Sequence, residues 1–166
     1  DVLQSEYLKQ SKPLEQMQKE LRELMEKQST VSLSHLKDIL RQYKYKEYLR
    51  ITIRDLGHLG EFVSILDELS SIAIACSQYA LQIATVSIAH PHFTTQELVH
   101  AKPPFSIIGM GKLGGNELNY SSDIDLIFVY HHEVDQKETW ESQETRLQVA
   151  RRYIEIMSDQ TSAGFL

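Results

Sequence analysis

The sequence predicts an α+β fold, in which a mainly helical amino-terminal lobe precedes the first strands and a helix of an α/β unit. Three observations support this prediction. Apolar residues recur at helical spacing through most of residues 13–83, and a glycine-rich turn joins two short apolar runs within residues 105–130. Residues 140–157 then return to helical spacing. Together these patterns indicate helices first and a strand–turn–strand unit after them.

The amino-terminal lobe is expected to contain three helices. The first covers residues 13–27, with Pro13 in the first turn, where a helix needs no N–H donor. The second covers residues 36–60 and becomes less regular toward Gly57 and Gly60. The third has the strongest apolar stripe, along residues 62–83. Three such stripes predict an antiparallel helical bundle.

A domain boundary is expected near residue 100. The tripeptides around Pro91 and Pro103 bracket a segment that helices avoid, because proline lacks the N–H and biases its predecessor toward extended geometry. Residues 1–100 are therefore interpreted as the helical lobe and residues 101–166 as the α/β unit. Within that unit, the runs at 105–108 and 124–130 predict strands.

Composition and charge exclude several classes of protein. The chain has 166 residues, 42% of them hydrophobic, with 17 Lys and Arg against 23 Asp and Glu, for a net charge of −6. Those values are typical of a globular protein and argue against disorder, and the acidic balance argues against nucleic-acid binding. Residues 69–89 carry no charge, but their polar side chains predict a helix buried in protein rather than in a membrane.

Two further features set expectations for the helical lobe. The single cysteine, Cys76, and the polar first ten residues predict a reducing, cytoplasmic location. Cys76 itself lies on an apolar stripe and is interpreted as a small core residue. A basic run is interpreted as a solvated helix face, and it consists of Arg41, Lys44, Lys46, Arg50 and Arg54.

The glycine-rich turn fits two kinds of nucleotide-binding motif poorly. Residues 109–114 read G-M-G-K-L-G, which satisfies the dinucleotide pattern G-x-G-x-x-G. That pattern needs a crossover helix of about ten or more residues before a parallel strand, and only seven residues separate Gly115 from Asp123. A Walker phosphate loop fails because Lys112 is followed by Leu113 and not by Ser or Thr.

Two acidic residues after the turn are the candidate chemical centre. Asp123 and Asp125 alternate with apolar residues at the head of a predicted strand, so both carboxylates are expected on one face. A carboxylate pair can hold Mg²⁺, which takes oxygen ligands and serves phosphoryl transfer. Other residues are predicted to contact phosphate or nucleotide through backbone N–H groups, hydroxyls or an ammonium, namely Gly114, Gly115, Ser121, Ser122 and Lys112.

Residues 109–130, GMGKLGGNELNYSSDIDLIFVY, also carry a resemblance to a known family. A double glycine followed by Asp-x-Asp on a strand is similar to the nucleotidyltransferase pattern shared with DNA polymerase beta. The full string more narrowly resembles the glutamate-ammonia-ligase adenylyltransferases, which add AMP to glutamine synthetase and remove it. The strings LRITIRDL at 49–56 and TSAGFL at 161–166 also resemble that family.

The resemblance implies an activity, with its metal ions and its partners. The string NYSSD at 119–123 looks more like the amino-terminal, adenylyl-removing copy of the domain than the adding copy. The implied reaction is phosphorolysis of adenylyl-tyrosine on glutamine synthetase, giving ADP, with two Mg²⁺ ions on Asp123 and Asp125. Regulation by a PII signal protein is implied as well. The alternatives are the AMP-adding copy, which uses ATP, and a non-catalytic nucleotide-binding regulatory module.

One departure from the family pattern affects the expected activity. The family's third metal carboxylate follows the stretch that resembles residues 164–166, where this chain stops. Glu117, Glu133 and Asp135 are the substitutes within the chain, and none lies on a predicted neighbouring strand. The expectation is a nucleotidyltransferase domain that is incomplete at its carboxyl end, binds metal weakly and does not turn over by itself.

Overall fold

The computed structural model describes residues 5–28, 32–90, 92–130, 140–159 and 166. Nine elements lie in these ranges: α1 (Ser5–Lys9), α2 (Leu14–Glu26), α3 (Leu33–Leu56), α4 (Phe62–Ala89), α5 (Thr95–Val99), β1 (Ser106–Gly109), α6 (Gly111–Gly114), β2 (Leu126–Val129) and α7 (Trp140–Ser158). Helices dominate, and one small sheet follows them. The predicted α+β class is confirmed.

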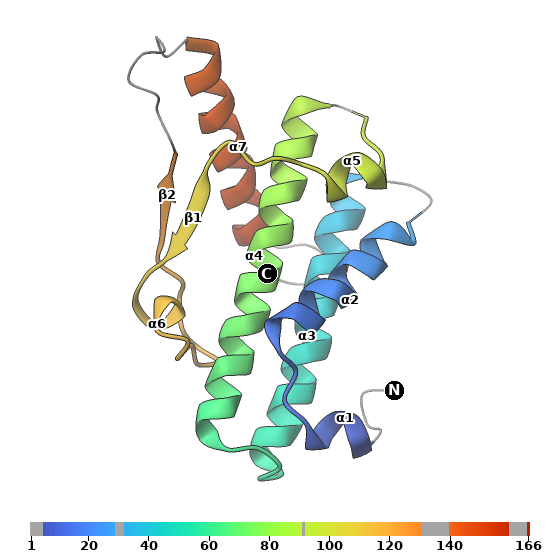
Figure 1. Cartoon of the computed structure of the whole chain (residues 1–166), viewed down its shortest axis with the longest axis vertical. Coiled ribbons are helices and arrows are strands. Elements are labelled where there is room, and N and C mark those ends of the chain that lie inside the picture. Colours follow the sequence, from blue (N-terminus) through green and yellow to red (C-terminus); the bar gives the residue numbers. More distant parts are fainter. Residues whose placement is uncertain (1–4, 29–31, 91, 131–139, 160–165) are drawn as a thin grey trace.

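Helix α4 lies at the centre of the molecule. Helices α2 and α3 cover one side of it, and α7 and the strands lie on the other side (Figure 1). Its apolar residues form a continuous core with residues of the neighbouring helices, including the fully buried Leu21, Leu40, Leu69, Ile72 and Ile83. The predicted helical lobe therefore forms around α4, which contacts helices on both sides.

The predicted helices agree closely with α2, α3 and α4. Pro13 differs slightly from its predicted place, because it is the residue before the helix and has an extended backbone. Helix α3 begins where the Ser32 hydroxyl accepts a hydrogen bond from the His35 backbone N–H at 3.2 Å, which satisfies a free donor of the first turn. It ends at Leu56, so Gly60 lies in the following turn rather than at the helix end.

The interpretation of the basic run as a solvated face is wrong for three of its five members. Arg41, Arg50 and Arg54 are each at most 2% exposed. Arg41 donates hydrogen bonds to the backbone carbonyls of Lys37, Ile156 and Asp159 and so joins α3 to the end of α7. Burial of these guanidiniums is possible because each has carboxylate or carbonyl oxygens within reach.

Helix α4 is long and apolar enough to cross a membrane by length and composition alone. Within the described residues, 56% of its most apolar window is buried by the rest of the chain. Six of the polar residues in its uncharged stretch form hydrogen bonds with other described residues, namely Ser70, Ser77, Gln78, Tyr79, Thr85 and Ser87. Packing against protein thus accounts for the apolar character of this helix.

The segment between the two proline clusters contains a short helix that the proline pattern did not predict. Helix α5 starts with a capping box, in which the Thr94 hydroxyl accepts from the Glu97 N–H and the Glu97 carboxylate accepts from the Thr94 N–H. These reciprocal bonds stabilise one turn despite the flanking prolines. The boundary near residue 100 stays a prediction, and the core runs through Leu98 and Phe105 on either side of it.

The two predicted strands form an antiparallel pair, β1 with β2, in which Ile108 lies opposite Ile127. The dinucleotide alternative is wrong, because that fold requires parallel strands joined by a crossover helix and α6 has only four residues. Edge-to-face ring contacts link Phe105 to Phe128 and Phe128 to Tyr153, with centroids 5.2 and 5.7 Å apart. This row of aromatic rings docks the sheet on α7.

Two hydrogen bonds fix the α/β unit against α4. The Leu118 backbone N–H donates to the Ser70 hydroxyl at 3.0 Å, and the hydroxyls of Ser77 and Tyr153 lie 2.7 Å apart. All four residues are buried. The loop that follows the glycine-rich turn is therefore held directly on the central helix, close to the acidic pair.

Candidate functional site

The two candidate carboxylates lie in the segment directly before β2. The hydrogen-bonded strand begins at Leu126, one residue later than Asp125, so the pair precedes the strand rather than opening it. Exposure alternates as the sequence predicted, with Asp123 and Asp125 exposed while Ile124 and Phe128 pack against the core. The Met110 N–H donates to the Asp125 carbonyl at 2.8 Å, which ties this segment to the end of β1.

The carboxylate of Asp125 faces Gly111, which was not among the predicted site residues. Gly111 has a φ of +53°, a left-handed conformation that L side chains rarely adopt. A methyl group placed on it would lie 3.6 Å from the Asp125 Oδ2 atom. The bare α-carbon of Gly111 therefore leaves space beside this carboxylate, and the signal for it was the second glycine of the G-M-G-K string.

The predicted phosphate glycines have different surroundings. A Cβ atom on Gly114 would lie 2.7 Å from the carbonyl oxygen of Gly109, so this residue packs tightly on the end of β1. A Cβ atom on Gly115 would meet only the flexible Glu117 side chain, at 3.3 Å. Both glycines are exposed. Their proposed contact with phosphate stays a prediction, and the structure supplies a packing reason for Gly114 alone.

This difference predicts unequal costs for two alanine substitutions. Gly114→Ala is expected to lower the free energy of unfolding by about 1–3 kcal/mol, because its methyl group would overlap a backbone oxygen that cannot move freely. Gly115→Ala is expected to change it by less than about 0.5 kcal/mol. Urea denaturation followed by circular dichroism measures both values, and equal losses in the two variants would contradict this account.

The two predicted serines form a turn with Asn119. The hydroxyl of Ser122 donates to Asn119 Oδ1 at 2.7 Å, and the backbone N–H of Ser121 donates to the same oxygen at 3.1 Å. The Asn119 N–H in return donates to the Ser122 hydroxyl at 3.2 Å. Asn119 thus orders the chain just before Asp123, a role that the sequence interpretation had not assigned.

No contact between Lys112 and the carboxylates of Asp123 or Asp125 occurs among the described residues. Lys112 is exposed and lines a separate surface pocket with Asp55, Phe62, Glu117 and Asn119, between the start of α4 and the loop after α6. Of the predicted substitutes for a third metal carboxylate, Glu117 packs beside Gly115, while Glu133 and Asp135 lie outside the described residues. No group of three or more His, Cys, Asp or Glu side chains within metal-binding reach occurs in the described part of the chain.

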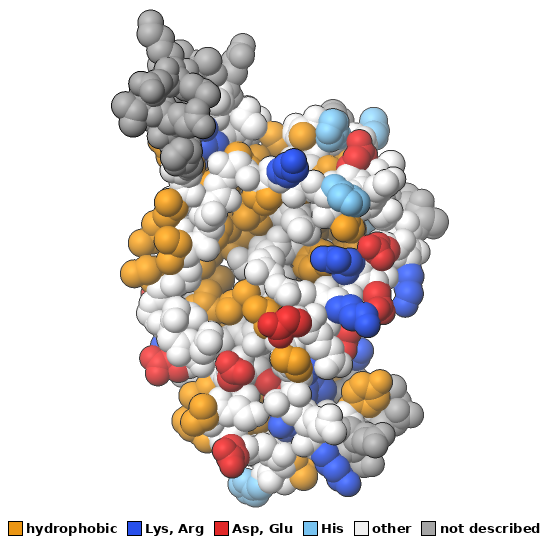
Figure 2. Space-filling model, in the orientation of Figure 1, with side chains coloured by type: hydrophobic (Ala, Val, Ile, Leu, Met, Phe, Trp, Pro, Cys, Tyr) orange, Lys and Arg blue, Asp and Glu red, His pale blue; other side chains and the backbone are white. Residues whose placement is uncertain are grey.

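Apolar side chains share the outer face of the strands with the acidic pair. Figure 2 shows apolar atoms gathered over this side of the molecule, and the exposed residues there are Ile108, Met110, Ile127, Val129 and Tyr130. Ile108, Ile127 and Val129 alternate with less exposed residues of the strands, and Met110 and Tyr130 directly follow the strands. The carboxylates therefore stand at the end of an apolar face rather than in a charged one.

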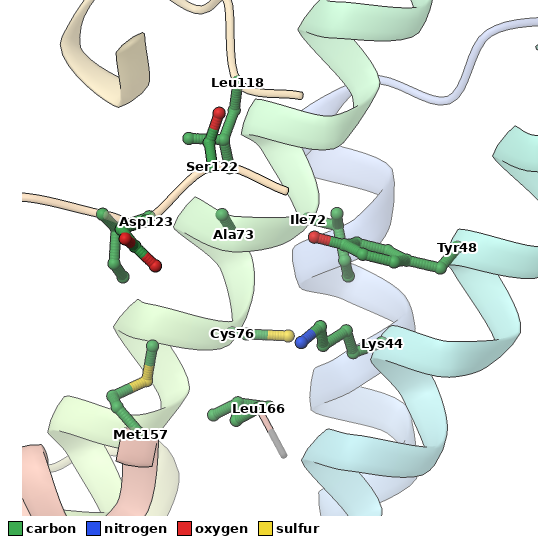
Figure 3. A pocket seen from close by; sticks show the side chains of 11 residues that line it. Lys44, Tyr48, Ile72, Ala73, Cys76, Leu118, Ser122, Asp123, Met157 and Leu166 are labelled. Atoms are coloured by element: carbon green, nitrogen blue, oxygen red, sulfur yellow. The ribbon is translucent and has the colours of Figure 1, made fainter. Parts of the chain in front are cut away.

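A cavity of about 170 Å³ lies between the helical lobe and the loop that carries Asp123. Lys44 and Tyr48 enter it from α3, Cys76 from α4, and Ser122 and Asp123 from the opposite wall (Figure 3). Sequence reasoning missed this cavity because its walls come from segments that are far apart in the chain.

Cys76 is 2% exposed, and burial raises the pKa of its thiol to about 12. At pH 8 a pKa about three pH units above the ordinary value of 9.0 leaves about a thousandfold less thiolate, the reactive form. Native protein is therefore expected to react with Ellman's reagent at least a thousandfold more slowly than protein unfolded in guanidinium. Equal rates in the native and unfolded states would contradict the burial of this thiol.

The family model for glutamate-ammonia ligase adenylyltransferase matches residues 1–166. The chain belongs to this family. It is 34% identical over 133 residues to a bifunctional glutamine synthetase adenylyltransferase/adenylyl-removing enzyme of Nitrosomonas europaea, a match that covers 77% of this chain and 14% of the relative.

Two further relatives with the same name match a larger share of this chain. The Idiomarina loihiensis protein is 33% identical over 158 residues, which cover 88% of this chain and 16% of the relative. The Pasteurella multocida protein is 31% identical over 159 residues, which cover 93% and 16%. The chain thus spans about one-sixth or less of the length of these relatives.

Proposed function

We propose that this adenylyltransferase-family chain carries a nucleotidyl-transfer site for the adenylyl group of glutamine synthetase, with Asp123 and Asp125 at its centre. The observation that carries the proposal is a pair of exposed carboxylates in a chain of this family, with Asp125 beside Gly111. Neither carboxylate forms a hydrogen bond or an ion pair with another side chain among the described residues. Both are therefore available to a ligand.

The acidic pair fits Mg²⁺ in its chemistry. Magnesium sites at phosphoryl groups commonly use one or two protein carboxylates and complete their octahedron with water and substrate phosphate oxygens. Asp123 and Asp125 would hold such ions, two of them in the complete site, and bound Mg²⁺ would supply charge stabilisation at the transferring phosphoryl group. In this proposal the remaining ligands come from the nucleotide, from water and from a further carboxylate.

The direction we propose is removal of AMP. An oxygen of inorganic phosphate attacks the phosphorus of adenylyl-tyrosine, the bond from phosphorus to the tyrosine oxygen breaks, and the products are ADP and free tyrosine on glutamine synthetase. The support is the turn that Asn119 forms with Ser121 and Ser122, because this string resembles the adenylyl-removing copy of the domain. A cytoplasmic location and regulation by a PII signal protein belong to the same proposal.

The test separates removal, addition and mere binding. A polypeptide of the relatives' length that contains this chain is given adenylylated glutamine synthetase with phosphate and Mg²⁺, and separately unmodified glutamine synthetase with ATP and Mg²⁺. Phosphate-dependent release of ADP supports removal. Incorporation of AMP instead would reassign the chain to the adding reaction, and nucleotide binding without either reaction would indicate a regulatory module.

The same experiment tests whether residues 1–166 suffice. The resemblance implies a third carboxylate beyond this chain, so we expect turnover in a polypeptide of the relatives' length and none in the chain of 166 residues. Turnover by the shorter chain would overturn that expectation.

A further inference from the structure

The cavity next to Asp123 has a cation whose charge has no carboxylate partner among the described residues. Lys44 is half-buried. The ring centroids of Tyr45 and Tyr48 lie 5.7 and 5.2 Å from its Nζ atom, which also points toward the Cys76 sulfur (Figure 3). Burial lowers the pKa of this ammonium. A half-buried ammonium facing a cavity needs hydrogen-bond acceptors, and a bound ligand can supply them.

The other walls of the cavity favour a flat, largely apolar ligand. Beside Tyr48 the lining includes Ile72, Ala73 and Cys76 from α4, all of them apolar. At about 170 Å³ the cavity is smaller than the roughly 300 Å³ at which pockets for drug-sized ligands begin. It therefore suits one ring system of a ligand rather than a whole nucleotide.

The charge of the cavity wall favours a neutral ring over an anionic ligand. The Asp123 carboxylate forms part of the wall opposite Lys44, so a phosphate inside the cavity would meet a like charge (Figure 3). A neutral purine avoids that repulsion. Adenine carries ring-nitrogen acceptors and an amino donor, which can pair with an ammonium on one side and with a hydroxyl or carboxylate oxygen on the other.

We propose that this cavity is the adenine subsite of the chain, with Lys44 donating to a ring nitrogen and Tyr48 contributing an aromatic wall. The inference rests on the proposed function, because it places the base of the adenylyl group next to the carboxylate that would serve its phosphate. It makes Lys44 a specificity-determining residue for adenine nucleotides. The ribose would lead out of the cavity, and the phosphate would lie outside it, at Mg²⁺ held by Asp123 and Asp125.

Calorimetric titration of the 166-residue chain with AMP and with ribose 5-phosphate, both with Mg²⁺, tests the subsite. Lys44→Met is expected to weaken AMP binding at least tenfold, and Ala73→Leu, which fills the cavity, is expected to do the same. Neither change should alter the affinity for ribose 5-phosphate, which lacks the base. The matched controls, Lys46→Met on α3 and Ala89→Leu on α4, alter exposed residues outside the cavity and should leave AMP binding unchanged.

The outcomes separate the subsite from the proposed function. If Asp125→Asn weakens AMP binding while Lys44→Met and Ala73→Leu do not, the function stands and the subsite is overturned. If the two cavity variants weaken AMP binding and Asp125→Asn does not, the subsite stands and the function fails. Equal losses for AMP and ribose 5-phosphate in Lys44→Met would show a phosphate contact and overturn the adenine assignment, as would absence of AMP binding by the wild-type chain. Thermal unfolding of each variant confirms that it is folded.

Discussion

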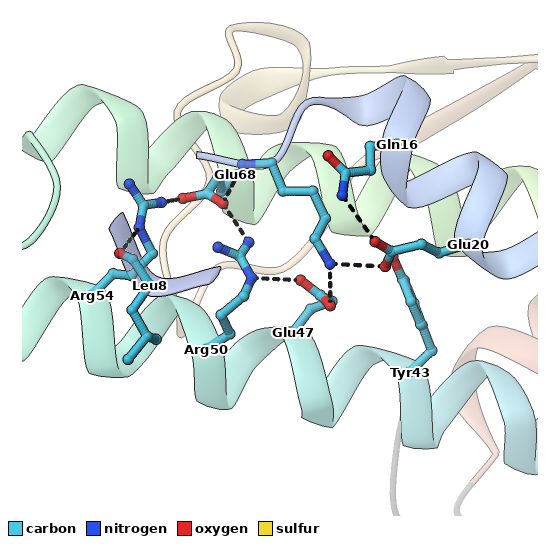
Figure 4. A network of polar contacts seen from close by, with 9 residues as sticks. Leu8, Gln16, Glu20, Tyr43, Glu47, Arg50, Arg54 and Glu68 are labelled. Atoms are coloured by element: carbon cyan, nitrogen blue, oxygen red, sulfur yellow. Dashed lines mark hydrogen bonds and ion pairs between the residues drawn. The ribbon is translucent and has the colours of Figure 1, made fainter. Parts of the chain in front are cut away.

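Replacement of Glu68 by glutamine is expected to lower the free energy of unfolding by about 3–5 kcal/mol, the usual cost of removing one partner from a buried ion pair. Glu68 lies on α4 and is 1% exposed. Its carboxylate pairs with the guanidiniums of Arg50 and Arg54 and accepts the backbone N–H of Lys12 at 2.8 Å (Figure 4). Glutamine would retain an acceptor but would leave these buried cations short of one negative charge.

The expected loss is large because Glu68 belongs to a balanced network. Lys12 pairs with Glu20 at 2.8 Å and with Glu47 at 2.7 Å, and Glu47 also pairs with Arg50 at 2.8 Å. With Glu68 and Arg54 the network holds three cations and three anions. It joins the segment before α2 to α3 and α4, so loss of its central carboxylate loosens three parts of the lobe together.

The measurement is urea denaturation followed by circular dichroism at pH 7. Asp67→Asn is the control, because it removes one negative charge from the neighbouring, exposed residue of the same helix. We expect that control to change the free energy of unfolding by less than about 0.5 kcal/mol. A loss no larger in Glu68→Gln than in Asp67→Asn would show that the network contributes nothing to stability.

The network also shows why part of the fold could not be predicted from the sequence. Periodicity located α2, α3 and α4 because the apolar residues that face the core recur within each helix. Arg50 and Arg54 of α3 were assigned to solvent because their carboxylate partner, Glu68, is 14 residues beyond Arg54 and on another helix. Only the tertiary packing of α3 against α4 reveals that these charges are buried together.

The candidate site also has one feature that the sequence predicts and two that it does not. Alternation of exposure around Asp123 and Asp125 is a local property of an extended chain, and it was predictable. The place of Gly111 opposite Asp125 depends on how β1 returns to β2, and the cavity at Lys44 depends on α3 meeting the loop after α6. Both features combine distant segments, and no spacing within one segment encodes them.

Replacement of Asp125 by asparagine is expected to reduce the proposed adenylyl transfer at least a hundredfold in a polypeptide of the relatives' length, while leaving the fold intact. A Lewis-acid metal contributes several kcal/mol of transition-state stabilisation, and an amide oxygen carries no charge with which to hold it. Asp125 is exposed and has no ion pair with another described residue, so its charge contributes little to stability. Asp125→Asn should therefore lose activity and keep its stability, whereas Glu68→Gln should lose stability.

Activity is measured as phosphate-dependent release of ADP from adenylylated glutamine synthetase over a range of Mg²⁺ concentrations, and unfolding is measured in urea. Asp123→Asn should behave like Asp125→Asn, whereas Asp67→Asn, equal in charge change but distant from the pair in the sequence, should retain both activity and magnesium dependence. A partial loss in Asp125→Asn that high Mg²⁺ restores would still assign the residue to metal binding, because weaker affinity is then the cause. Full activity of Asp125→Asn at low Mg²⁺ would show that the acidic pair does not hold the magnesium used in the reaction, and it would overturn the proposal.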